Sequence, residues 1–357
     1  MIPTPEVQQR PRAGIGKLAV AAFLSVAALI AVALCLPYQG FANEVFVDIP
    51  HGTGTRGIAR ALARAGVLRS ALQFELVRAV RPGAKLQAGE YRFSRSASAL
   101  EIFDRIAHGD IYFFEFTVPE GANMFDIARQ LEAQNILPAA DFLAAAKDPQ
   151  LIVDLAPKAK SLEGYLFPST YRLTKHVTAE QLVHQMTTEF RKQWKKVSET
   201  VNPGDVRTMV TLASLVEKET GVASERPLIA SVFANRLTKG MKLECDPTTI
   251  YAALLEDRYT GIIHRSDLES KNPYNTYQNV GLPPGPIANP GAASLSAALS
   301  PAPTNYLFFV ATPQGGSHNF SESIAQHEKA VINYRRAAHR TALKALAAKN
   351  NVEGKKR

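Results

Sequence analysis

Residues 18–36 form an uninterrupted apolar run of 19 residues in which Ser25 is the only polar side chain. A run of this length can cross the hydrocarbon core of a bilayer as one helix, and it is long for the core of a cleaved signal peptide, which is the alternative. Cationic residues precede the run and acidic residues follow it, so the positive-inside rule places residues 1–17 in the cytoplasm and the rest of the chain outside it. The sequence therefore predicts a single transmembrane helix over 18–37.

The net charge of the 357-residue chain is +9, but this charge lies at its two ends. Residues 1–17 carry +2 and residues 335–357 carry +7, which leaves the body between them neutral. A neutral body argues against the long basic groove of a nucleic-acid-binding protein, so we expect no nucleic-acid partner. The basic tail over 346–357 is interpreted as a solvated segment, with contact to anionic lipid or wall polymers as the alternative.

The two cysteines, Cys35 and Cys245, do not form a disulfide framework, because the first falls within the apolar run. The part of the chain outside the membrane must therefore be held together by its hydrophobic core.

A strand, a Pro/Gly turn and an amphipathic helix are predicted twice, over 49–68 and again 69 residues later over 118–137. Between them, GEYRF (89–93) alternates like a strand, and 98–109 has the pattern of a helix that ends at a glycine.

These patterns predict several domains after the membrane span. One small α/β module covers 43–115, a second small α/β module or linker covers 116–155, and a larger domain covers 156–345. The basic tail follows this domain.

Two glutamates interrupt the apolar face of a helix that begins at Val206. On a helical wheel, Glu217 and Glu219 both fall inside the apolar arc, where a carboxylate is costly unless it is compensated. A salt bridge to Arg226 or Arg236 is the structural interpretation for either residue.

Glu219 has a second unusual property, because Thr220-Gly221 directly after it predicts the end of the helix. The negative end of the helix dipole and an apolar surrounding both raise the pKa of a carboxyl group. A carboxyl that stays protonated near neutral pH is what general-acid cleavage of a glycosidic bond requires. We therefore expect Glu219 to be catalytic and Glu217 to support the fold or a neighbouring side chain.

Asp246 is the nearest candidate for a second carboxylate, but Asp-Pro-Thr-Thr is also a helix N-cap signal, and the cap is the preferred interpretation. A hydrolase needs an acid and a partner. A lyase that uses a hydroxyl group of the sugar itself as the nucleophile needs only one acid/base group.

The loop over 272–291 is rich in proline and in uncharged polar and aromatic residues. We expect it to form a sugar-binding wall, with a rigid structural Ω-loop as the alternative. The wall residues are Tyr274, Asn275, Thr276, Tyr277 and Asn279. Motifs for zinc, phosphate or serine-hydrolase chemistry are missing from the sequence, and we expect no cofactor and no metal site.

Several motifs together resemble the MltG (YceG-like) endolytic murein transglycosylases. In order, they are LEGYLFPSTY, ASLVEKET, ASVFANRL, GMKLECDPTTIY, YNTYQNVGLPPGPIANPG and NYLFFVA…HNFS. The resemblance is dense over 160–330 and looser over 43–155, where the family carries a LysM-like region. Cys245 departs from the polar residue found at this place in other members.

The resemblance implies lytic cleavage of the MurNAc–GlcNAc bond within nascent glycan strands, with a 1,6-anhydro-MurNAc end as the product. The second Glu of EKET, which is Glu219, corresponds to the catalytic residue of the family. The expected fold class is α+β, with an N-terminal transmembrane helix, a small LysM-like α/β module and a mixed α/β catalytic domain. The family implies one span in the inner membrane with the bulk of the chain periplasmic, peptidoglycan glycan strands as substrate, and cell-wall synthases as candidate partners. The alternative is a membrane-tethered protein that binds peptidoglycan, recruits synthases and has no turnover.

Overall fold

The computed structural model describes residues 13–202 and 204–354, which form two compact units. The N-terminal unit extends to Phe114 and includes Arg172–His176, and the C-terminal unit holds the remaining residues. Most of the predicted cytoplasmic segment, residues 1–12, lies outside the described residues, as do residues 355–357 of the predicted tail.

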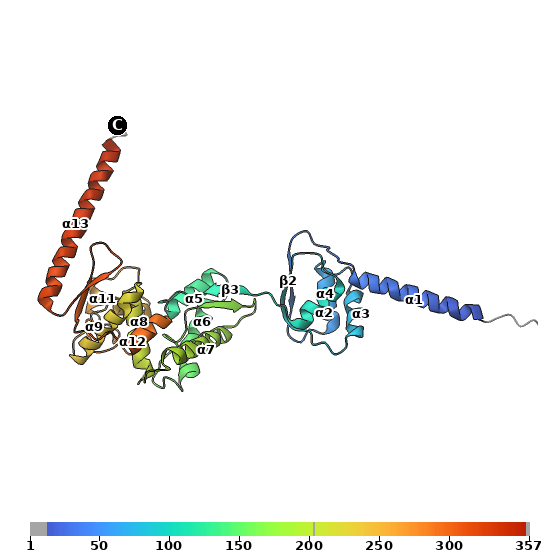
Figure 1. Cartoon of the computed structure of the whole chain (residues 1–357), viewed down its shortest axis with the longest axis horizontal. Helices are drawn as coiled ribbons and strands as arrows, with labels where there is room; N and C mark the ends of the chain where they lie inside the picture. Colours follow the sequence, from blue (N-terminus) through green and yellow to red (C-terminus); the bar gives the residue numbers. More distant parts are fainter. Residues whose placement is uncertain (1–12, 203, 355–357) are drawn as a thin grey trace, which may run out of the picture. The chain divides into compact units, whose positions relative to one another are not determined.

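The N-terminal unit contains a two-stranded antiparallel sheet and four helices (Figure 1). Its elements in order are α1 (Ala13–Cys35), β1 (Val45–Ile49), α2 (Thr55–Arg64), α3 (Ala71–Val80), β2 (Gly89–Phe93) and α4 (Ala99–His108). The predicted strand over 89–93 is confirmed as β2, which pairs with β1 in the register Val47↔Tyr91. The predicted helix over 98–109 is confirmed as α4. It begins after Ser98, which caps it together with Glu101, and it ends at Gly109 in the left-handed conformation.

The core of this unit is formed by the apolar faces of the sheet and of α2, α3 and α4. Its largest fully buried side chains include Tyr91, Phe74, Phe93, Phe103 and Leu62. The sheet and helices therefore make a small α/β module, whose LysM-like nature stays a prediction.

The apolar run lies in α1, whose bounds cover most of the predicted span. Within residues 13–202 and 204–354, no helix has both the length and the apolar character needed to cross a membrane. The prediction of a transmembrane helix over 18–37 is therefore not confirmed.

The chain from Phe114 through the first half of the C-terminal unit forms a short sheet and three helices. Its elements are β3 (Phe114–Thr117), α5 (Met124–Ala133), α6 (Ala139–Ala146), a 3₁₀ turn (Pro149–Ile152), β4 (Thr170–Leu173) and α7 (Ala179–Val197). β3 pairs with β4, and α6 packs against both α5 and α7. The second predicted strand, turn and helix are thus confirmed as β3 and α5, in the same order as β1 and α2.

The second half of this unit is built around three helices that pack on one another, namely α8 (Val206–Glu219), α9 (Arg226–Thr238) and α12 (Ala292–Leu299) (Figure 1). A 3₁₀ turn (Ala223–Glu225) connects α8 to α9, and α10 (Asp246–Leu255) and α11 (Arg265–Glu269) follow. β5 (Phe308–Ala311) and β6 (His318–Ser321) form an antiparallel hairpin, and both strands contact α13 (Ile324–Gly354). Short antiparallel strands and many helices make the whole fold mixed α/β, as predicted.

A buried polar network fixes the frame of the C-terminal unit. Asn289 accepts a hydrogen bond from the backbone of Gly164 (2.8 Å) and donates one to Glu163 (3.0 Å). Glu163 also accepts from the Met124 backbone (2.9 Å) and from the Tyr251 hydroxyl (3.0 Å). The network joins α5, α10 and two loops that are distant in sequence. Burial raises the pKa of Glu163 to about 8.

Candidate functional site

Glu219 is the last residue of α8, as the Thr-Gly signal predicts. The helix ends because Thr220 adopts an extended conformation (φ −147°, ψ 137°), and a left-handed glycine is not used. The hydroxyl of Thr220 accepts a hydrogen bond from the Val222 backbone at 2.9 Å, which stabilises the turn that follows. This position puts the carboxyl group at the negative end of the helix dipole.

The carboxyl group of Glu219 lies in the wall of a cavity of about 240 Å³. This cavity is lined by residues from α8, α9, β5 and α13 and from the start of α10. Two loops also contribute, namely the segment before α10 and the loop over 272–291. The lining residues are Glu219, Phe233, Arg236, Leu243, Glu244, Asp246, Tyr277, Phe309 and His327. A concave site with apolar and aromatic walls and a few converging polar groups is the usual form of a ligand site.

Burial raises the pKa of Glu219 above its ordinary value, and the nearby charge of Asp246 raises it further. The thiol of Cys245 hydrogen-bonds to Glu219, and this bond lowers the pKa in part, as do the charges of His318 and Arg236. The net effect is a carboxyl group that holds its proton at higher pH than an exposed glutamate. Cys245 is itself buried, and burial raises the pKa of its thiol, so it stays protonated and donates to Glu219.

Glu217 faces a different part of the structure. One of its oxygens lies 3.2 Å from Nη2 of Arg226, and the other accepts a hydrogen bond from the Gly291 backbone at 2.8 Å. Its side chain is only 5% exposed, so the ion pair is nearly dry. This is the arginine pair that the structural interpretation predicted, and it connects α8 to α9 and to the start of α12.

Asp246 lies in the Glu219 cavity and is not the N-cap of α10. The cap position belongs to Cys245, which makes no side-chain capping bond, and Asp246 is the first helical residue. The preferred interpretation of Asp246 as a cap is therefore wrong. Its carboxylate accepts a hydrogen bond from the Tyr277 hydroxyl at 2.5 Å, because the loop that carries Tyr277 passes over the start of the helix.

The predicted sugar-binding wall is only partly present at this cavity. Of its five residues, Tyr277 lines the cavity together with Glu219. Asn275 and Thr276 are fully buried, so they cannot touch a glycan in this conformation. Asn275 donates to the Ser270 carbonyl at 2.7 Å, and Thr276 accepts from the Cys245 backbone at 3.0 Å.

The two remaining wall residues also serve the loop itself. Asn279 donates to the carbonyls of Asn272 (2.9 Å) and Asn275 (3.0 Å). The ring of Tyr274 packs against Tyr251, with 5.1 Å between their centroids. Four of the five residues therefore contact neighbouring groups of the protein, and the sugar-binding role of the loop stays a prediction.

Sequence reasoning named Arg236 only as a candidate salt-bridge partner of the two glutamates, and it missed His327 as a residue of the site. Arg236 is a buried cation of α9 that donates to the backbone carbonyls of Leu307 (2.7 Å) and Leu243 (2.8 Å). It thereby fixes the segment that leads into β5 and the segment that leads into α10. An arginine inside an otherwise apolar helical pattern was the available signal. His327 reaches the cavity from α13, near the end of the chain, and the sequence carried no comparable signal for it.

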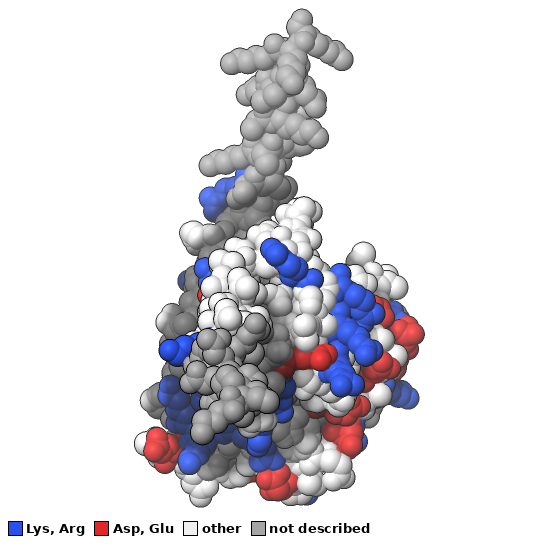
Figure 2. All heavy atoms as spheres, turned by 90° about the vertical axis from the view of Figure 1, so that its right-hand side faces the viewer, with Lys and Arg blue, Asp and Glu red and all other residues white. Residues whose placement is uncertain are grey.

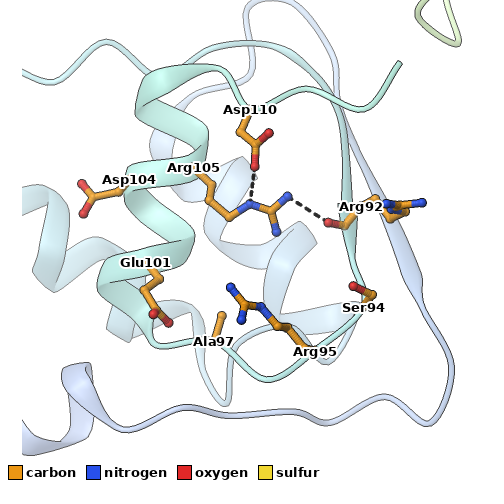
Figure 3. A pocket seen from close by; sticks show the side chains of 8 residues that line it. All are labelled: Arg92, Ser94, Arg95, Ala97, Glu101, Asp104, Arg105 and Asp110. Atoms are coloured by element: carbon orange, nitrogen blue, oxygen red, sulfur yellow. Dashed lines mark hydrogen bonds and ion pairs between the residues drawn. The ribbon is translucent and has the colours of Figure 1, made fainter. Parts of the chain in front are cut away.

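A second cavity lies in the N-terminal unit, beside α4 and the end of β2 (Figure 3). It measures about 530 Å³ and is lined by Arg92, Ser94, Arg95, Ala97, Glu101, Asp104, Arg105 and Asp110. Figure 3 shows Arg105 of α4 between Asp110, with which it forms an ion pair, and the backbone carbonyl of Arg92. A hydrogen bond from the Ser98 backbone lowers the pKa of Glu101, so this carboxyl group is ionised and unsuited to general-acid chemistry. The smaller Glu219 cavity is therefore the candidate active site.

Glu163 is another carboxyl group with a raised pKa, but it is enclosed in the network described above and is only 2% exposed. Three hydrogen-bond donors surround it, which leaves no room for a substrate. Its position indicates a structural role.

The chain matches known proteins over most of its length. The sequence model of the YceG-like family matches residues 47–333. A Bacillus subtilis protein named endolytic murein transglycosylase is 33% identical over 315 residues, which cover 82% of this chain and 85% of that protein. A protein of the same name from Streptococcus pneumoniae is 29% identical over 81% of this chain, which spans 58% of that longer relative.

A solved structure agrees with these sequence matches. The crystal structure of a yceG-like protein from Listeria monocytogenes, determined at 2.6 Å, has a TM-score of 0.53 and 32% sequence identity. The match covers 81% of this chain and 99% of that chain. With the family match extending over most of the chain, and with the Glu219 cavity inside the matched region, the chain belongs to the YceG-like family.

Proposed function

We propose that the chain is a peptidoglycan lytic transglycosylase, a lyase that cleaves the MurNAc–GlcNAc bond within glycan strands. The observation that carries this proposal is Glu219, a carboxyl group of raised pKa in the wall of a cavity. The names of the relatives support the same reaction class.

In the proposed mechanism, Glu219 first acts as general acid. Its proton goes to the glycosidic oxygen as the bond from C1 of MurNAc to that oxygen breaks, and the GlcNAc end leaves with the proton. The C6 hydroxyl of the same MurNAc then attacks C1, and the Glu219 carboxylate accepts the hydroxyl proton. The C1–O6 bond closes the 1,6-anhydro ring, no water is consumed, and the acid is regenerated.

The other polar groups of the cavity support these two roles of Glu219. The charge of Asp246 raises the pKa of Glu219 and so favours the protonated form that the first step needs. Arg236 and the Cys245 thiol favour the carboxylate that the second step needs. These effects act in opposite directions on the pKa, whose net shift is upward.

Mass spectrometry of purified peptidoglycan after incubation with the protein tests the proposal. Anhydro-MurNAc ends are the expected product. Reducing ends would indicate a hydrolase in which Asp246 acts as the second carboxylate. Unchanged glycan would favour a peptidoglycan-binding protein that recruits synthases without turnover.

The location of the chain is a further part of the proposal. We place the bulk of the chain on the periplasmic side of the inner membrane, tethered by the apolar run, where nascent strands are accessible. The sequence of this run and the exposed apolar side chains of α1, such as Phe23 (72% exposed) and Leu29 (69%), support this placement. A reporter that is active only in the cytoplasm, fused after residue 357, should be silent, and an active reporter would contradict the placement.

The N-terminal module is proposed to bind glycan in the manner of a LysM-like region, on the basis of the sequence resemblance over 43–155. On the face shown in Figure 2, a group of Lys and Arg side chains lies beside Asp and Glu side chains. Such mixed charge favours an uncharged polymer over a polyanion as the ligand. A variant of the protein that lacks residues 43–115 should cleave long glycan strands with a raised KM. An unchanged KM in this variant would refute the binding role of the module.

A further inference from the structure

His327 lines the Glu219 cavity, but the mechanism above assigns it no role. It lies near the start of α13, and its ring stacks on Phe308 of β5 with 5.2 Å between the centroids. Burial lowers its pKa, and the Arg236 cation lowers it further. The imidazole is therefore neutral near pH 7.

The Nδ1 atom of His327 is buried and has no hydrogen-bond partner among the described residues. A buried polar atom left without a partner is costly, and native proteins keep few of them. A neutral imidazole offers one donor and one acceptor, and no neighbouring group here fixes which nitrogen carries the proton. The ring can therefore adapt to a partner of either kind.

The charged groups around His327 lie in the cavity wall and on α13, and three of them are engaged in other contacts. They are Glu219, which accepts from Cys245; Glu244, which pairs with Arg236; Asp246, which accepts from Tyr277; and Glu328, which neighbours His327 on α13. Arg236 carries donors only and is held by backbone carbonyls. A ligand in the cavity can supply the missing partner.

We propose that His327 is a substrate-contacting residue whose neutral imidazole hydrogen-bonds to a hydroxyl or acetamido group of the glycan bound at Glu219. This inference rests on the proposed function, because it takes the glycan as the ligand. Hydroxyl groups both donate and accept, so they match a ring whose tautomer is not fixed. Phe309 and Phe233 supply apolar surface for a sugar ring beside it. The role of His327 is binding and orientation, and no covalent bond changes at the imidazole.

The test compares His327→Phe with the native protein in two assays. Phenylalanine keeps the stacking on Phe308 and removes both nitrogens. In a Glu219→Gln background, calorimetric titration with uncrosslinked glycan strands should give a Kd about tenfold higher, which corresponds to one hydrogen bond of about 1.4 kcal/mol. In the active protein, KM should rise by a similar factor while kcat changes less than about threefold. The melting temperature should hold or rise, because a buried nitrogen without a partner is gone.

Two further variants separate binding from a structural effect. His339→Phe, at an exposed position of the same helix, should change neither Kd nor KM. His327→Asn, whose amide offers a donor and an acceptor close to the place of Nδ1, should recover part of the binding. If the native protein cleaves glycan and His327→Phe leaves both Kd and KM unchanged, this inference alone is overturned. A native protein that neither binds nor cleaves glycan would overturn the proposed function together with it.

Discussion

Replacing Glu217 by glutamine tests whether the two glutamates of α8 have separate tasks. Removal of one partner from a buried ion pair costs about 3–5 kcal/mol, because the other charge stays buried. The loss is smaller here, because the glutamine oxygen can still accept from the Gly291 backbone. Arg226 also keeps Ser294, at 3.0 Å, and the half-exposed Glu120, at 3.6 Å. We expect Glu217→Gln to lower the free energy of unfolding by about 2 kcal/mol.

A change of this size should lower the melting temperature by roughly 4–8 °C for a unit of this length. Thermal unfolding followed by circular dichroism measures the shift, and turnover of glycan should stay within about tenfold of the native rate. The control is Glu269→Gln, which breaks the exposed pair with Arg265 and should cost less than about 0.5 kcal/mol. Equal melting temperatures for the two variants would show that the Glu217–Arg226 pair contributes nothing. Loss of turnover in Glu217→Gln at an unchanged melting temperature would show that the two carboxyl groups have been assigned in reverse.

Three further predictions concern titration and the cavity. Because burial raises the pKa of Glu163 to about 8, the native state binds its proton more tightly than the unfolded state, and stability should fall as the pH rises from about 5 through 8. Urea unfolding over this range should show the fall, and Glu163→Gln should remove it. Cys245→Ala removes a hydrogen bond that lowers the pKa of Glu219, so the basic limb of the pH profile of kcat/KM should move to higher pH. A basic limb at the native pH would contradict the hydrogen bond between Cys245 and Glu219. Tyr277→Phe removes the hydroxyl that holds Asp246, and kcat should fall about tenfold in a steady-state assay; a native kcat would show that this bond is irrelevant to turnover.

Local patterns predicted the elements that position Glu219. The apolar periodicity of α8 and the Thr-Gly signal after it were sufficient to place Glu219 at a helix end, because both depend on neighbours within a few residues. For the same reason, the strand at 89–93 and the capped helix after Ser98 agree with the structure to within a residue. Such features are fixed by backbone geometry and side-chain period alone.

Contacts between distant segments could not be predicted in this way. The polar side chains of the loop over 272–291 were assigned to a ligand, whereas Asn275 and Thr276 bind backbone groups of their own and neighbouring segments. Asp246 was assigned to a cap because nothing in the sequence shows that Tyr277 reaches it. His327 enters the cavity because α13 packs on the β5–β6 hairpin, whose strand β5 also contacts α9. A single sequence does not encode these long-range juxtapositions in any periodic signal.

The central claim is that the proton of Glu219 cleaves the glycan. Glu219→Gln keeps the shape of the side chain and removes the titrating proton, so the direct measurement is anhydromuropeptide production by this variant and by the native protein, with the melting temperature of each. We predict at least a hundredfold lower production with a melting temperature that holds or rises slightly, because a partly buried acid is gone. Production at the native rate by Glu219→Gln would contradict the account and move the search to Asp246, another carboxylate that lines the cavity.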